Sequence, residues 1–147
     1  MAIPRLLMLI ALLLAAPLAV PAQTAGFAVV AHRAVPVDAL SAAELRRVFL
    51  KKQTHWADGT PIAVVEMTGD PALREGFYGR ILNSTVERMT AYWINETMTH
   101  AVAPPRLYGT AAMLLDYVAR TPGAIGFVPA GTPLPPEIKH LEMEPTP

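Results

Sequence analysis

The stretch that most constrains the fold lies near the carboxyl end and reads Arg-Thr-Pro-Gly-Ala-Ile-Gly-Phe-Val-Pro, residues 120–129. Pro122 cannot continue a helix, because it lacks an amide hydrogen and its ring clashes with the preceding turn. Gly123 permits the sharp reversal that follows. Residues 125–128 form a short apolar run, typical of a strand inside a covered sheet. A helix therefore ends and a buried strand begins within a few residues, which indicates an α/β protein.

The amino-terminal segment has the pattern of an export signal. Arg5 precedes an apolar core at residues 6–16, and small residues around Ala22 favour cleavage there. The core is shorter than the roughly 20 apolar residues that a membrane span needs, and no cysteine follows to carry a lipid. We expect cleavage after Ala22, a periplasmic location and no stable membrane anchor. The alternative is an uncleaved anchor, which Pro17 and Pro21 disfavour because they interrupt the helix.

The composition excludes several classes of function. The 12 basic and 12 acidic residues balance to a formal charge of zero, so no basic field attracts nucleic acid. Because the chain has no cysteine, thiol catalysis, thiolate metal sites and disulfides are excluded. The 4 histidines lack the spacing of a metal-binding helix, and no serine stands in a Gly-x-Ser-x-Gly elbow. We therefore expect no metal, no cofactor and no enzyme activity, although carboxylates paired by the fold would leave no sequence signature.

Capping residues mark where helices begin. Residues 41–44 have the form of a capping box, in which the serine oxygen and the glutamate carboxylate each accept from the other's amide. The dipeptide at 70–71 is a second helix start, since aspartate caps free amides and proline needs none at the first helical position. Further helices are expected at 85–97 and 110–120.

Strands alternate with these helices. Apolar runs at 27–31 and 62–66 predict buried strands, and a short edge strand is expected at 138–143. Residues 100–108 are expected to form a connecting loop. This alternation implies an α/β fold with a small, mainly parallel sheet of three or four strands flanked by helices. The expected organisation is a signal peptide at 1–22, one domain at 23–132 and a proline-rich tail at 133–147.

Three blocks of sequence occur in an order that marks a known family. They are Leu-Ser-Ala-Ala-Glu-Leu at 40–45, His-Trp-Ala-Asp-Gly-Thr-Pro-Ile at 55–62 and Thr-Pro-Gly-Ala-Ile-Gly-Phe-Val at 121–128. Together they resemble the central lobe of the phosphate-binding proteins of periplasmic ABC transporters. The resemblance implies the fold of one lobe of a periplasmic binding protein and a transport or sensing role for a small oxyanion such as phosphate. Because the segments for a second lobe are missing, a partner protein or a homodimer would complete the cleft.

The binding loop of that family implies a set of site residues. Family members carry an arginine and then a Ser-Gly-Thr, whose backbone amides hold the anion at a helix N-terminus. Here a methionine stands where the arginine is expected, and Thr68, Gly69 and Asp70 follow. The resemblance points to Thr68 and Gly69 as ligand groups, with Arg74 folding back over the site. The alternative interpretation is a helix that Asp70 caps itself, with Arg74 on the surface.

One further pair of residues joins the candidates. His32 and Arg33 follow the first expected strand, and α/β folds bind ligands in loops beyond the carboxyl ends of parallel strands. A structural or surface role is the alternative for both. The sequence thus supports two hypotheses: a periplasmic solute-binding-like domain that holds a small oxyanion weakly or with a partner subunit, and a protein-interaction or accessory module that has lost ligand binding.

Overall fold

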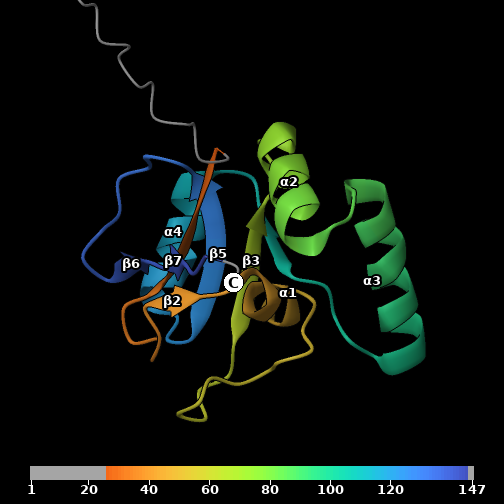
Figure 1. Cartoon of the computed structure of the whole chain (residues 1–147), viewed down its shortest axis with the longest axis horizontal. Helices are drawn as coiled ribbons and strands as arrows, with labels where there is room; N and C mark the ends of the chain where they lie inside the picture. Colours follow the sequence, from red (N-terminus) through yellow and green to blue (C-terminus); the bar gives the residue numbers. More distant parts are fainter. Residues whose placement is uncertain (1–25, 146–147) are drawn as a thin grey trace, which may run out of the picture.

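A five-stranded sheet forms the centre of the molecule in the computed structural model, which describes residues 26–145 (Figure 1). The strand order is β4-β3-β5-β1-β6. Strand β3 runs parallel to both β4 and β5, whereas β1 runs antiparallel to both β5 and β6. The bounds are Phe27–His32 for β1, Ala63–Met67 for β3, Arg106–Tyr108 for β4, Ala124–Pro129 for β5 and Ile138–His140 for β6. A separate parallel pair joins β2, Ala39–Leu40, to β7, Glu142–Met143.

The predicted α/β class is confirmed, and the sheet is larger than the three or four strands expected. Residues 106–108 were expected in a loop, but they pair as β4 with residues 65–67 of β3. Their side chains are largely exposed, so the apolar pattern that reveals a buried strand is missing there. At the opposite edge, β6 provides the strand expected within 138–143. The expected signal peptide, residues 1–22, lies outside the described residues.

The helices begin where the capping residues predict. Helix α1, Ala42–Phe49, opens with the capping box of Ser41 and Glu44, and α2, Pro71–Phe77, opens with Asp70 as its N-cap. Threonine caps open the other two, at Thr85 and Thr110. Helix α2 continues directly into the π-helical turn η1, Tyr78–Leu82. Helix α3 spans Val86–His100 and helix α4 spans Ala111–Arg120.

The helices cover both faces of the sheet, as neighbouring residues of β5 show. Phe127 stacks on Phe77 of α2 with ring centroids 3.9 Å apart, and Phe49 of α1 lies 4.7 Å from Phe77. Successive strand residues point to opposite faces, and on the other face a Cβ at Gly126 would lie 3.3 Å from Leu114 of α4. Helices α1 and α2 therefore cover one face, with α4 on the other (Figure 1).

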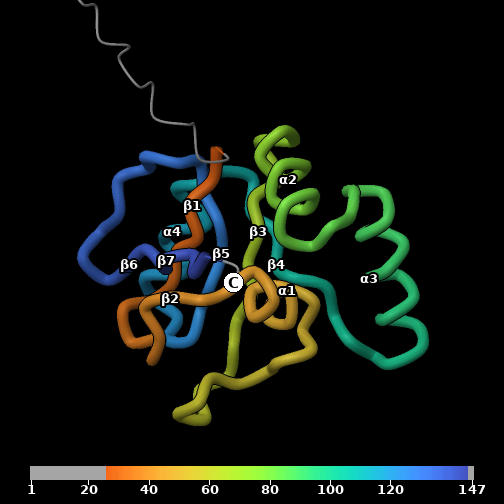
Figure 2. The backbone as a smooth tube through the Cα atoms, in the orientation of Figure 1, coloured from red at the N-terminus to blue at the C-terminus, as the bar shows by residue number. Residues whose placement is uncertain are grey.

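Helix α3 lies to one side, beyond the edge strand β4 (Figure 2). The hydroxyl of Tyr92 donates to the Leu50 carbonyl at 3.2 Å, which ties α3 to the end of α1. The ammonium of Lys52 adds an ion pair with Glu96 at 3.8 Å. These contacts hold α3 beside the sheet instead of flat against it. Within residues 26–145, no helix has the length and apolar character needed to cross a membrane.

Candidate functional site

The loop that the resemblance marks as an anion site lies at the carboxyl end of β3. The amide of Thr68 donates to the Tyr108 carbonyl at 2.8 Å, and its hydroxyl reaches the same oxygen at 3.3 Å. A Cβ on Gly69 would lie 2.1 Å from the carbonyl oxygen of Gly109, so only glycine allows the two loops to approach this closely. Thr68 and Gly69 therefore join the ends of β3 and β4, and the threonine amide and hydroxyl already have a protein partner.

Asp70 occupies the helix terminus that would hold an anion. Its Oδ1 accepts from the amide of Leu73 at 3.0 Å, which confirms the expected N-cap. A carboxylate at this end stabilises α2, because the amino terminus of a helix carries partial positive charge. An added anion would meet a like charge at the same place.

The side chain of Arg74 reaches a buried carboxylate on β3. One guanidinium nitrogen donates to the hydroxyl of Tyr78 at 2.9 Å and lies 3.5 Å from Oε2 of Glu66. The Arg74 side chain is 20% exposed, so it is neither a surface arginine nor a free cation over the loop at 68–69. Its charge is engaged by Glu66 and Tyr78.

His32 and Arg33 lie at the other end of the sheet. Strand β1 is antiparallel to β5, with Phe27 opposite Pro129 and Ala31 opposite Ile125. Since β5 lies between β1 and β3 and is parallel to β3, the carboxyl end of β1 lies at the same edge of the sheet as the amino end of β3, at the opposite edge from Thr68. The premise that placed this pair beyond a parallel strand is therefore wrong. The fold does not bring His32 and Arg33 together with Thr68, Gly69 and Arg74.

Glu66, Arg74 and Tyr78 form a buried polar cluster that the sequence analysis missed. Glu66 is 2% exposed and accepts a hydrogen bond from the Tyr78 hydroxyl through Oε2. Burial raises the pKa of the Glu66 carboxyl, against the opposing effects of Tyr78 and Arg74. Burial also raises the pKa of the Tyr78 hydroxyl, and the Glu66 carboxylate adds to that shift. The signal that could have revealed the cluster is an acidic residue within an otherwise apolar strand, Ala-Val-Val-Glu-Met.

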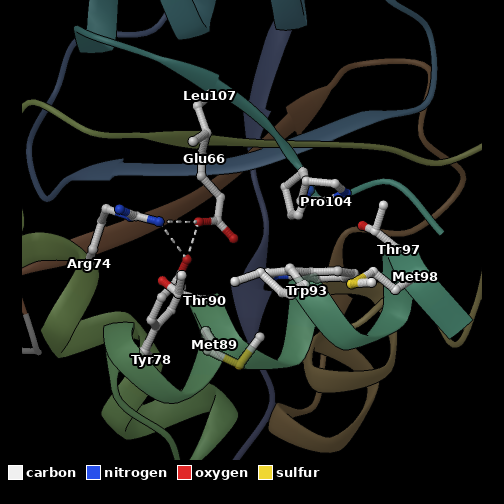
Figure 3. A pocket seen from close by; sticks show the side chains of 12 residues that line it. Glu66, Arg74, Tyr78, Met89, Thr90, Trp93, Thr97, Met98, Pro104 and Leu107 are labelled. Carbon is white, nitrogen blue, oxygen red and sulfur yellow. Dashed lines mark hydrogen bonds and ion pairs between the residues drawn. The ribbon is translucent and has the colours of Figure 1, made fainter. Parts of the chain in front are cut away.

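This cluster forms one side of a pocket of about 410 Å³ between α3 and β4 (Figure 3). The ring of Trp93 and the side chain of Met89 line the pocket from α3, and Pro104 and Leu107 line it from the opposite segment. Large apolar side chains at its rim are unusually exposed, at 57% for Ile94, 83% for Met98 and 51% for Leu107. The remaining lining residues are Thr90, Thr97 and Pro105. The volume lies in the range of roughly 300–1,000 Å³ that is typical of small-molecule sites.

Two buried donors beside this pocket lack hydrogen-bond partners within the described residues. They are Nε1 of Trp93, whose residue is 8% exposed, and Nε of Arg74. The other tryptophan differs, since Nε1 of Trp56 donates to the Gly123 carbonyl at 3.0 Å. Among residues 26–145, no group of three or more potential ligands is placed to hold a metal ion. The arrangement thus suits hydrogen bonding to a bound molecule.

The structure is an α/β lobe with a pocket beside its edge strand. No protein-family model and no curated protein matches the sequence. Solved structures do match, and they bear out the predicted resemblance at the level of the fold.

An ABC-type phosphate transport receptor from Vibrio cholerae aligns with a TM-score of 0.62 at 22% identity, over 82% of this chain and 48% of the receptor. A second match is a structure from Clostridium perfringens described as a phosphate ABC transporter substrate-binding protein with bound phosphate. It aligns with a TM-score of 0.61 at 16% identity, over 80% of this chain and 44% of that protein's chain. PstS from Borrelia burgdorferi aligns with a TM-score of 0.59 at 12% identity, over 82% of this chain and 49% of the PstS chain. The chain spans about half the length of the solved structures it matches.

Proposed function

We propose that this chain is an exported binding domain built on one lobe of the solute-binding-protein fold, and that it recognises its ligand through the pocket between α3 and β4. The observation that carries the proposal is this pocket, which combines apolar walls with a buried cluster of Glu66, Arg74 and Tyr78. Trp93, which also lines the pocket, has an indole donor without a partner within residues 26–145. Apolar pockets with a few convergent polar groups and a perturbed pKa are the usual form of a small-molecule site.

The helix terminus favoured by the resemblance is a poorer site for a free oxyanion. The Asp70 carboxylate caps α2, and Arg74 is engaged by Glu66. Recognition through the pocket accounts for the polar groups that the fold leaves without partners, whereas recognition at the helix terminus requires displacing a cap.

Weak oxyanion binding is the second candidate function. It is favoured by the fold that this chain shares with the Clostridium perfringens structure, which contains bound phosphate. On this hypothesis the loop of Thr68 and Gly69 holds the anion, and a partner protein or a second copy of the chain completes the cleft. Light scattering with and without phosphate tests that assembly.

A titration of the purified protein with phosphate and sulfate separates the two candidates, with sodium chloride at matched ionic strength as the control. A ligand that binds only the folded state raises Tm by mass action, so we expect no rise with either anion up to about ten millimolar. The variant Asp70→Ser keeps a good N-cap but removes the negative charge. A saturable rise in Tm with phosphate that becomes larger in Asp70→Ser would place the site at α2 and refute recognition through the pocket.

A further inference from the structure

Two residues that line the pocket between α3 and β4 have polar atoms without a hydrogen-bond partner in the described part of the chain: Glu66 and Trp93. Oε2 of Glu66 is engaged by Tyr78 and Arg74, whereas Oε1 accepts no hydrogen bond from residues 26–145. Figure 3 shows this second oxygen turned away from Arg74, toward the side of the pocket where Trp93 and Pro104 lie. The pocket wall therefore includes an acceptor at Glu66, and Trp93 of the same wall has a buried Nε1 donor without a partner among residues 26–145.

The charges that line the pocket already balance. Glu66 and Arg74 are the charged residues of the lining, and they lie 3.5 Å apart. A bound anion would face the Glu66 carboxyl, and a bound cation would face the Arg74 guanidinium, each without a second countercharge in a largely apolar site. Burial of an unpaired charge is costly, so the pocket selects against ionic ligands.

A neutral molecule meets both requirements. Its apolar body fills the space among Met89, Trp93 and Leu107, and its polar group supplies the partners that Glu66 Oε1 and Trp93 Nε1 do not find among the described residues. A buried donor or acceptor without a partner costs free energy, so a ligand that pairs both groups gains over a purely apolar one.

We propose that this pocket binds a compact, uncharged, largely apolar solute that donates a hydrogen bond to Oε1 of Glu66 and accepts one from Nε1 of Trp93. The inference rests on the proposed function, because it specifies the ligand chemistry of the same pocket. Primary amides and alcohols on an aromatic or branched aliphatic body have this chemistry.

The experiment titrates the isotope-labelled protein with four probes of one shape: benzamide, toluene, benzoate and benzylammonium. Proton–nitrogen spectra report the indole N–H of Trp93, assigned by its loss in Trp93→Phe. The indole N–H of Trp56 serves as the internal control, since it already donates to Gly123. We expect a saturable downfield shift of the Trp93 signal with benzamide. The affinity for benzamide should exceed that for toluene by at least about three- to tenfold, which is the gain typical of one neutral hydrogen bond and therefore a lower bound for two. Benzoate and benzylammonium should bind more weakly than benzamide.

Two variants test the contributions of the polar groups. Trp93→Phe keeps a ring but removes the donor, and Glu66→Gln keeps the shape but changes the acceptor. Each should weaken benzamide binding about threefold or more while leaving toluene binding within about twofold. Glu96→Gln is the matched control, because Glu96 is a buried glutamate of α3 that pairs with Lys52 outside the pocket. It should leave all four affinities unchanged.

The outcomes separate this inference from the proposed function. Equal binding of toluene and benzamide would overturn the polar recognition while keeping the pocket as the binding surface. Tighter binding of benzoate or benzylammonium would overturn the preference for neutral ligands. If no probe shifts the Trp93 signal up to its solubility limit, the small-solute proposal is overturned. Phosphate-dependent shifts at the amides of Thr68 and Gly69 would instead refute the proposed function, whatever benzamide does.

Discussion

The variant Tyr78→Phe measures how much the buried polar cluster contributes to stability. Tyr78 is 1% exposed, and its hydroxyl donates to Glu66 and accepts from Arg74 at 2.9 Å. The substitution removes one oxygen without changing the ring, so its packing against Phe77 is kept. Its effect therefore isolates the two hydrogen bonds.

The magnitude follows from the partners. A hydrogen bond to a charged group contributes about 1.5–3 kcal/mol, and two such bonds are lost. Arg74 lies 3.5 Å from Glu66 and can move closer, which recovers part of the loss. We expect a net decrease in the free energy of unfolding of about 2–3 kcal/mol, larger than for an exposed neutral hydrogen bond.

The assay is urea denaturation at pH 7, with Tyr92→Phe as the matched control. The hydroxyl of Tyr92 is only partly buried and donates to a neutral carbonyl, that of Leu50, at 3.2 Å. Its removal should cost about 0.5–1.5 kcal/mol. If Tyr78→Phe costs no more than Tyr92→Phe, or if it stabilises the protein, then the cluster is not a satisfied buried network.

Three further predictions follow from the same region. The pKa of Glu66 is raised in the folded state above its ordinary value of 4.5, so the stability that this group contributes is complete below pH 4.5 and is lost as the pH rises through the folded pKa. Denaturation measured across pH should therefore show the wild type losing stability relative to Glu66→Gln as the pH rises. A gain in the relative stability of the wild type would contradict the shift. Asp70→Ala should lower the free energy of unfolding by about 1 kcal/mol through loss of the cap, and Asp70→Ser by clearly less; equal losses would argue against capping. Gly69→Ala should lower Tm strongly, because the added Cβ would collide with the Gly109 carbonyl. Gly76→Ala is the control: it lies in open space within α2 and should stabilise the protein by about 0.5–1 kcal/mol. Similar Tm values for the two variants would rule out the close approach of Gly69 to Gly109.

Local signals in the sequence were sufficient to locate most helices and strands. The capping box at Ser41 and Glu44, the Asp70 cap and the stop at Pro122 and Gly123 all depend on groups within a few residues of one another. Such interactions can be recognised from sequence because the chain itself holds the partners together. The α/β class followed from the alternation of these elements.

The direction of the first strand depended on the tertiary structure. An apolar run such as residues 27–31 indicates burial on both faces, but it carries no information on whether the strand runs parallel or antiparallel to its neighbour. The fold inserts β5 between β1 and β3, and β1 is antiparallel to β5. That choice moved His32 and Arg33 to the wrong end of the sheet for the predicted site.

The pocket itself was decided only by tertiary packing. Glu66 comes from β3, Arg74 from α2, Tyr78 from η1 and Trp93 from α3. Arg74 and Tyr78 stand four residues apart and are hydrogen-bonded, a spacing that a sequence can reveal, but only the fold brings them to Glu66 and Trp93. The sequence alone determined the lobe-type fold and the capped terminus of α2, because those follow from short-range patterns. The three-dimensional fold decided that Arg74 turns toward a buried glutamate and that α3 stands off the edge strand, because both depend on contacts between distant segments.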